Sequence, residues 1–132
     1  TVVEGAGAVG LAAVQSFPER FRGRRVGLVL SGGNIDSRLL SACILRGLVR
    51  TERLVRLRVG IPDSPGSLAQ VTAVIGDAGG NVIDVEHQRA FSQRSIKQAD
   101  VDFTIETRNA AHAETIGAAL TQGGFAVVRL SS

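Results

Sequence analysis

The sequence contains no methionine and only one cysteine, and both absences limit what the chain can be. Without methionine, residue 1 is not a natural start of translation, and we interpret the chain as a piece of a longer protein. A lone Cys43 excludes an intrachain disulfide, which is typical of a reducing compartment and predicts a cytoplasmic protein. Because Cys43 stands in an apolar, helix-like run, we expect a buried thiol rather than a nucleophile.

Long apolar runs and basic clusters are also missing. The longest uncharged window, residues 5–18, is too short and too rich in glycine and alanine to span a bilayer, and no charged segment precedes it as in a signal peptide. The net charge is only +3, and arginines alternate with carboxylates instead of forming a basic run with aromatic neighbours. We therefore expect neither a membrane nor a nucleic acid as partner.

Histidine is scarce as well, with His87 and His112 as its two copies. Neither has a cysteine or carboxylate at the spacing of metal ligands, so the sequence predicts no metal site. His87 shares the predicted strand face of Ile83 and Val85, and we expect it to be partly buried near a subunit contact.

Residues 1–52 alternate short apolar runs with helix-like segments. The pattern predicts strands at 1–3 and 26–30 and helices at 7–17 and 36–50. Continuous apolar strands separated by helices are typical of a parallel sheet that is buried on both faces. Two such strands do not make a stable sheet alone. We therefore interpret this part as the C-terminal remnant of a larger α/β domain, followed by a linker helix.

Residues 53–132 predict a complete α+β fold of the ferredoxin-like βαββαβ type. Strict alternation predicts two strands, at 54–61 and 99–107, and a further strand is expected at 81–89, before a polar hairpin loop. A last strand is expected at 125–130. The inward side chains of the two alternating strands are Val55, Leu57, Val59, Ile61, Ala99, Val101, Phe103 and Ile105.

Two helices complete this pattern. The first is predicted to begin at Ser64 as N-cap, with Pro65 in the first helical position, and to end at Gly79. The second is predicted to begin near Asn109 as cap. The apolar positions of the two helices are Leu68, Val71, Val74, Ile75 and Ala78, and then Ala113, Ile116 and Leu120.

The predicted topology is a four-stranded antiparallel sheet with both helices on one face. The other face then presents arginines of the first strand beside acids of the third, and such opposite charges contribute about 0.2–1 kcal/mol per pair. This face is stable in water, so self-association is expected at strand edges or helix sides. The charged residues in question are Arg56, Arg58, Asp100, Asp102 and Glu106.

The run "GAGAVG" at residues 5–10 has the glycine spacing of a dinucleotide-binding loop. That site also needs an acidic residue about 20 positions further on, at the end of the next strand. Here the strand ends at Ser31, and Glu19 and Asp36 both fall outside it. The sequence therefore disfavours a nucleotide site.

The run "LSGGNID" at residues 30–36 leaves two interpretations open. Ser31 follows a buried strand, and strand ends are where open α/β sheets bind ligands, so its hydroxyl would point at a cofactor or substrate. Alternatively, the two glycines form a turn that leads into a helix capped by Asn34 or Asp36.

Together, "VVEGAGAVGLAAV" and "VGLVLSGGNID" resemble the last segment of the pyridoxal-phosphate enzymes of the threonine dehydratase and serine racemase type. The resemblance implies pyridoxal phosphate in the full-length parent, with Ser31 bonded to the ring nitrogen, Gly32 beside it and Glu4 nearby. The family often has proline after this glutamate, where this chain has Gly5.

Residues 53–132 resemble an ACT domain, and "VEHQRAF" is typical of the copy in threonine dehydratases. The resemblance implies a regulatory domain of an enzyme of isoleucine biosynthesis, which oligomerises through its ACT domains and binds an amino-acid effector (Ile, Val, Thr or Ser) beside the loop after the first strand. The positions matching the family's effector site are Asp63, Ser64, Gly66, Ser67, Leu68, Asn81 and Val82.

The chemistry of that loop agrees with an amino-acid ligand. Unpaired N–H groups and the positive end of the helix dipole suit a carboxylate, while Asp63 would take the ammonium group. Asn81 offers both a donor and an acceptor. In the alternative interpretation Asp63 and Ser64 only cap a helix, Asn81 only occupies a turn, and the domain is an oligomerisation module that binds no effector.

We expect no catalysis by this chain alone. A pyridoxal enzyme needs a lysine for its Schiff base. The one lysine, Lys97, lies in the predicted hairpin loop of residues 53–132, whereas Ser31 belongs to residues 1–52. The implied parent would deaminate L-threonine to 2-oxobutanoate and ammonia.

Overall fold

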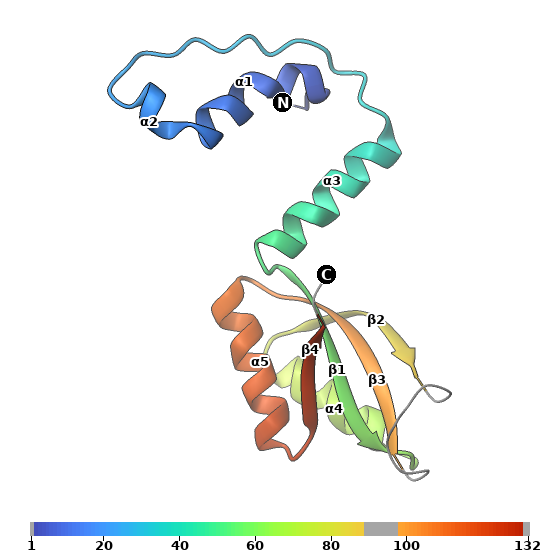
Figure 1. The fold of residues 1–132 in the computed structure, drawn as a ribbon. Coiled ribbons are helices and arrows are strands. Elements are labelled where there is room, and N and C mark those ends of the chain that lie inside the picture. Colours follow the sequence, from blue (N-terminus) through green and yellow to red (C-terminus); the bar gives the residue numbers. More distant parts are fainter. Residues whose placement is uncertain (1, 89–97, 131–132) are drawn as a thin grey trace. The chain divides into compact units, whose positions relative to one another are not determined.

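The computed structural model describes residues 2–88 and 98–130 and divides into two units between Ile44 and Leu45 (Figure 1). The first unit contains helices α1 (Gly5–Ser16) and α2 (Pro18–Phe21), and α3 (Ser37–Arg50) runs across the boundary. None of the helices in the described residues is long and apolar enough to cross a bilayer.

The strands predicted at 1–3 and 26–30 are wrong for the residues that the structure describes, because residues 2–3 and 26–30 form neither strand nor helix. An extended segment becomes a strand only when a neighbour pairs with its N–H and C=O groups. No strand lies beside either segment within 2–88 and 98–130, and Val29 is 84% exposed. Apolar sequence alone does not reveal whether such a neighbour exists.

Helix α3 begins where the sequence predicts. Asp36 is its cap, since Oδ1 accepts hydrogen bonds from the N–H groups of Arg38 and Leu39 at 3.0 and 3.1 Å. The prediction of a buried Cys43 is wrong, because the cysteine is exposed and α3 has no buried residue. A helix-like apolar pattern predicts that one face of the helix is apolar. In the described residues, nothing packs on α3 closely enough to bury this face.

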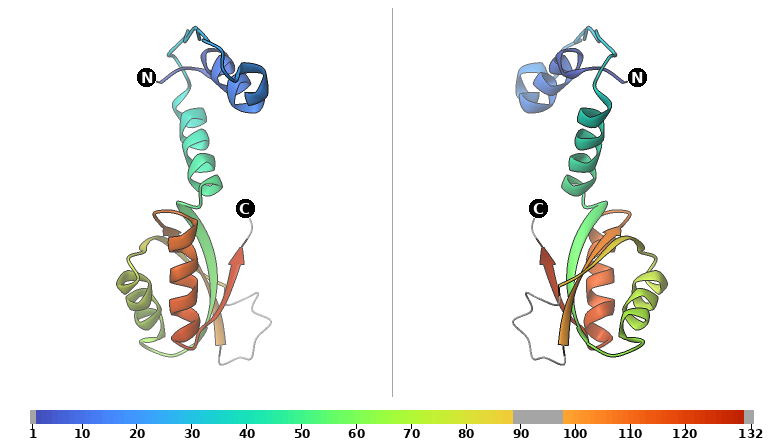
Figure 2. Two further views of the ribbon diagram at one scale, coloured as in Figure 1. Left: turned by 90° about the vertical axis from the view of Figure 1, so that its left-hand side faces the viewer. Right: turned by 90° about the vertical axis from the view of Figure 1, so that its right-hand side faces the viewer.

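The second unit is the predicted ferredoxin-like fold. Its elements are β1 (Leu54–Pro62), α4 (Ser67–Asp77), β2 (Asn81–His87), β3 (Gln98–Glu106), α5 (Ala110–Gln122) and β4 (Ala126–Leu130). The strands form an antiparallel sheet in the order β2-β3-β1-β4. Figure 2 shows both helices on one face of this sheet, and none of the described helices or strands of this unit covers the other face.

The core lies between the sheet and the two helices, as predicted. All eight inward positions of β1 and β3 are buried, and α4 and α5 contribute apolar side chains from one stripe each. Asn109 caps α5, as expected, because its Oδ1 accepts from the His112 N–H at 3.0 Å. The buried helix residues in this core are Val71, Ile75, Ala113, Ile116 and Leu120.

Helix α4 does not begin at Ser64 and Pro65, so the predicted cap is wrong. Gly66 is the N-cap, and its φ of +89° lies in the left-handed region that glycine tolerates best. The Ser64 N–H donates to the Pro62 carbonyl at 2.9 Å, which makes a tight turn directly after β1. The chain therefore needs two more residues before it reaches helical geometry at Ser67.

Strand β2 differs from its predicted pattern. The register against β3 shifts between Val82 and Asp84, and Ile83 is 55% exposed. His87 is exposed too, so the prediction of partial burial is wrong in the single chain. The predicted end of β2 at residue 89, and the loop with Lys97, lie outside the described residues.

Candidate functional site

A first hollow, of about 370 Å³, lies at the β1–α4 loop. It brings together four residues predicted from the sequence, Asp63, Ser64, Gly66 and Leu68, and adds His87 from the end of β2. The fifth loop residue, Ser67, is buried. Its hydroxyl lies 2.9 Å from that of Ser64, so this pair holds the loop closed on itself.

The start of α4 lies beside this hollow, which Gly66 and Leu68 line. The N–H of Ser67 donates to the Ser64 carbonyl at 3.3 Å, and that of Gln70 donates to the Gly66 carbonyl at 3.1 Å. Between them, the N–H groups of Leu68 and Ala69 have no partner among residues 2–88 and 98–130. Free N–H groups at the positive end of a helix suit a carboxylate.

Asn81 and Val82 do not join this hollow within one chain. In the sheet, Glu106 of β3 lies between Asn81 of β2 and Leu54 of β1, so Asn81 is level with the start of β1. Asp63, in contrast, follows the end of β1. Eight residue steps along a strand correspond to about 26 Å. Val82 is partly buried against the core. The structure thus places the two parts of the predicted site at opposite ends of the sheet.

Asn81 instead lines a second hollow, of about 560 Å³. Its Nδ2 donates to Oε2 of Glu106 at 3.3 Å. Arg53 and Arg108 also line this hollow, and neither guanidinium forms an ion pair with a residue that the structure describes. Sequence reasoning missed both arginines, because 55 positions separate them and no pattern joins them.

His112 is buried at the base of this second hollow. Its Nδ1 accepts a hydrogen bond from the Arg108 N–H at 3.1 Å, and its Nε2 lies 2.8 Å from the Ala78 carbonyl oxygen. Both contacts are satisfied when the ring proton is on Nε2. His112 therefore ties the end of α4 to the start of α5.

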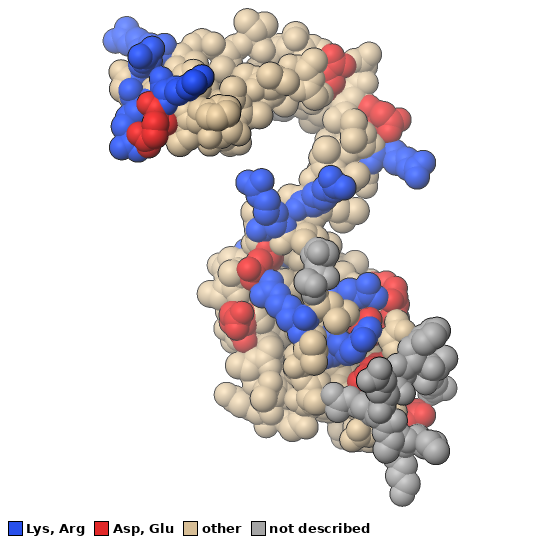
Figure 3. Space-filling view, in the orientation of Figure 1, with Lys and Arg blue, Asp and Glu red and all other residues tan. Residues whose placement is uncertain are grey.

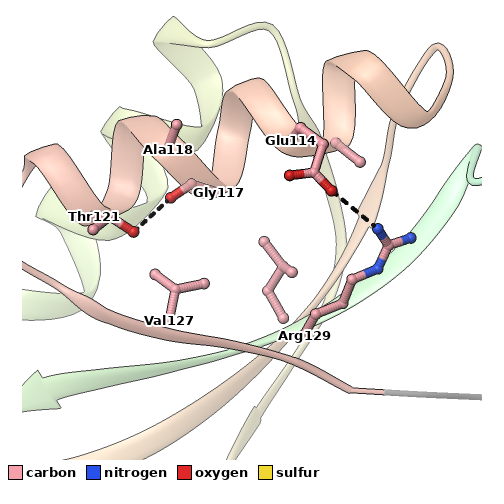
Figure 4. A pocket seen from close by; sticks show the side chains of 8 residues that line it. Glu114, Gly117, Ala118, Thr121, Val127 and Arg129 are labelled. Carbon is pink, nitrogen blue, oxygen red and sulfur yellow. Dashed lines mark hydrogen bonds and ion pairs between the residues drawn. The ribbon is translucent and has the colours of Figure 1, made fainter.

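A third hollow, of about 330 Å³, lies between α5 and strands β1 and β4 (Figure 4). Figure 4 shows Glu114 on α5 and Arg129 on β4 pointing toward one another across one end of it. The Arg129 guanidinium lies 3.7 Å from Glu114 and 2.8 Å from Glu52. No pattern in the sequence predicts this hollow.

The sheet face away from the helices carries a network of ion pairs, and Figure 3 shows positive and negative side chains next to each other on the second unit. Arg58 donates to both carboxylate oxygens of Asp102 at 2.6 and 2.9 Å, and Arg56 bridges Asp102 and Glu86. The hydrogen bond from Arg58 lowers the pKa of Asp102, an effect that burial partly opposes. The same pair raises the pKa of Arg58.

The residues that the resemblance assigned to a cofactor come together in the first unit. The Glu4 N–H donates to the Gly32 carbonyl at 3.1 Å. Gly32 has a φ of +74°, and a Cβ there would lie 2.3 Å from Oε1 of Glu4. Ser31 is exposed. A Cβ on Gly7 would lie only 2.1 Å from the Ser31 carbonyl oxygen. Glycines thus allow the Ser31–Gly32 turn to pack on the start of α1.

Comparison with protein families agrees with the fold of the second unit. The family described as "ACT domain" matches residues 55–122. These residues run from the beginning of β1 to the end of α5.

Individual relatives extend the similarity to nearly the whole chain. The L-threonine ammonia-lyases of Thermotoga maritima and Geobacter sulfurreducens are each 36% identical to it over 126 residues, which is 96% of this chain. The biosynthetic L-threonine dehydratase of Haemophilus influenzae is 28% identical over 137 residues, covering 98% of this chain and 25% of its own length. The chain spans 31% of the length of the first two relatives.

Proposed function

Because the chain belongs to the ACT-domain family, we propose that residues 53–132 are the amino-acid-sensing domain of a pyridoxal-phosphate-dependent threonine ammonia-lyase. The parent enzyme would deaminate L-threonine to 2-oxobutanoate and ammonia in the cytoplasm. Its effector would be a small amino acid such as isoleucine, valine, threonine or serine. The similarity to two L-threonine ammonia-lyases along 96% of the chain supports this parent.

The observation that carries the proposal is the hollow at the β1–α4 loop. The free N–H groups of Leu68 and Ala69 would receive the effector's carboxylate. Asp63, which lines the same hollow, would receive its ammonium group. Leu68 and Ile61 would contact an aliphatic side chain. One small hollow thus offers a complementary group for each part of a free amino acid.

We propose further that Asn81 contributes from a second copy of the domain. Strand β2 is an edge of the sheet, and an antiparallel pairing of two β2 edges would bring the start of one against the end of the other. Asn81 of one copy would then approach the Asp63 loop of its partner. This arrangement reconciles the opposite positions of the two residues with one effector site.

Residues 1–52 would belong to the catalytic part of the parent. Pyridoxal phosphate stabilises a carbanion next to the substrate's amino group when it is bound. The Ser31–Gly32 turn suits the cofactor's ring nitrogen, because Ser31 is exposed and its hydroxyl can donate or accept a hydrogen bond. Glu4 lies against Gly32. Catalysis would need a Schiff-base lysine from another part of the parent.

Thermal unfolding with a panel of amino acids (Ile, Val, Thr, Ser, Leu) tests the sensor. A ligand of the folded state adds about 2.7 kcal/mol of stability at a hundredfold excess over its dissociation constant. We expect at least one amino acid to raise the melting temperature in a saturable manner, and Asp63→Ala to reduce the shift. The matched control is Asp77→Ala, which replaces an exposed acid at the end of α4. No shift with any amino acid would contradict the proposal.

A mixing experiment tests the shared site. If Asp63 and Asn81 act across two copies, Asp63→Ala and Asn81→Ala each lose binding, but a mixed dimer of the two variants holds one intact site. Refolding an equal mixture should therefore restore part of the ligand-induced shift. No restoration would contradict a site shared between two copies.

The second candidate function is an oligomerisation module that binds no effector. It is favoured by the Ser64–Ser67 hydrogen bond, which accounts for both hydroxyls without a ligand. In that case no amino acid changes the melting temperature, whereas the melting temperature rises with protein concentration.

A further inference from the structure

The groove between α5 and β4 has the composition of a small-molecule site. Most of its lining is aliphatic or small, formed by Leu57 and Val127 from the sheet and by Ala113, Gly117 and Ala118 from the helix, with Thr121 as a further, polar member. Its volume of about 330 Å³ falls at the lower end of the range for ligand pockets. It therefore suits a ligand with a short aliphatic chain.

The end of the groove carries one charge of each sign. Glu114 projects from α5 and Arg129 from β4, and their nearest atoms are 3.7 Å apart (Figure 4). A guanidinium binds a carboxylate through two parallel hydrogen bonds, and a carboxylate accepts from an ammonium group. The two groups that every free α-amino acid carries would thus each have a partner of opposite charge, directly beside an aliphatic surface.

Gly117 keeps the middle of the groove open. It lies within α5, and a Cβ built on it would have no heavy atom within 4 Å. A Cβ at this lining position would therefore enter open space.

From this geometry we propose that the α5–β4 groove is a second binding site, for an aliphatic α-amino acid. Arg129 binds the carboxylate, Glu114 binds the ammonium group, and the side chain lies on Leu57 and Val127. This site is distinct from the loop hollow lined by Asp63 and shares no residue with it. Each chain accordingly binds two amino-acid molecules.

Occupation of the groove affects the connection between α3 and β1. Arg129 also pairs with Glu52 at 2.8 Å, and Glu52 is the one non-glycine with positive φ among the described residues, at +53°. A ligand carboxylate competes with Glu52 for the same guanidinium. Ligand binding in the groove therefore weakens the ion pair of Glu52, the residue in the turn after α3.

Isothermal titration calorimetry with L-leucine tests this site in an Asp63→Ala background, where the loop site is disabled. We expect one bound leucine per chain. Gly117→Leu should abolish this binding by filling the groove. Gly76→Leu is the matched control, because Gly76 also lies within a helix with open space around its Cβ position but does not line the groove. It should leave binding unchanged.

Two leucine analogues test the charged end. 4-Methylpentanoate lacks the ammonium group and isopentylamine lacks the carboxylate, so each should bind at least about tenfold more weakly than leucine, the factor that 1.4 kcal/mol of lost interaction produces. Equal binding of either analogue would overturn the assignment of Glu114 or Arg129.

The outcomes separate this site from the loop site. Loss of all binding in Asp63→Ala would overturn the groove and leave the loop. Binding in the wild type that is lost with Gly117→Leu but not with Asp63→Ala would support the groove and contradict the loop. If Gly117→Leu changes only the sedimentation coefficient and not leucine binding, the groove is an interface between copies, and the proposal is wrong.

Discussion

Arg58 and Asp102 face each other across β1 and β3 as a two-point ion pair, with Nε and Nη2 of the arginine donating to Oδ1 and Oδ2 of the aspartate. Asp102 is only 2% exposed, although it lies on the sheet face away from the helices. The alternating pattern of β3 predicts that this carboxylate faces water. Arg58 and Arg56 cover it instead, and a buried carboxylate is tolerable because these cations accompany it.

This pair predicts how stability depends on pH. Because the folded state lowers the pKa of Asp102, its stabilising contribution is complete above the unfolded-state value of about 3.9 and is lost as the pH falls through the lower, folded-state value. Urea unfolding between about pH 5 and pH 2 should therefore show a loss of stability. Asp102→Asn removes the ionisation, so its stability should fall less steeply over the same range. Parallel curves would contradict this account.

The fold of the second unit could be predicted because its pattern is local. Alternation in β1 and β3 identifies the buried face, and Asn109 identifies the start of α5. The same reasoning failed for residues 26–30, where an apolar run indicates burial but not the neighbour that a strand requires. It also failed for Cys43, for the same reason.

The candidate site could be predicted only in part. The loop residues Asp63 to Leu68 are close in sequence, so a motif identifies them together. Asn81 was grouped with them although β1 and β2 run in the same direction, which puts the start of one strand far from the end of the other. The pairs Arg53 with Arg108 and Glu114 with Arg129 depend on strand order and helix packing, and no local pattern contains them.

Gly66, in the β1–α4 loop, should be sensitive to substitution. Its φ of +89° is unfavourable for any residue with a Cβ, although there is open space around that position. Gly66→Ala should therefore destabilise the domain by about 1–2 kcal/mol through backbone strain alone. Gly76→Ala, within α4 and equally open, should instead stabilise it by about 0.4–1 kcal/mol. Denaturant unfolding of both variants measures these opposite changes in the free energy of unfolding. No change in Gly66→Ala would be inconsistent with the loop geometry.

His112 should matter for stability, whereas His87 should not. His112→Leu removes the acceptor of the Arg108 N–H and the donor to the Ala78 carbonyl. Both hydrogen bonds are partly buried, so leaving the two groups unsatisfied should cost about 1 kcal/mol, the lower end of the range for buried groups. His87 is exposed, so His87→Leu should change the free energy of unfolding by less than about 0.5 kcal/mol. Equal effects of the two substitutions would show that His112 is not the tie between α4 and α5.

Glu52 combines a strained backbone with an ion pair, and two substitutions separate these effects. Its φ is +53°, and α3 ends around it with N–H groups of Glu52 and Arg53 donating to the carbonyls of Val49 and Leu48. Helices that end in this way usually have glycine at the left-handed position. Glu52→Gln removes only the charge that pairs with Arg129. Glu52→Gly removes the same charge and also the strain, so it should be more stable than Glu52→Gln by about 1 kcal/mol in denaturant unfolding. A glycine variant less stable than the glutamine variant would mean that the Glu52 side chain stabilises the turn through its packing rather than its charge.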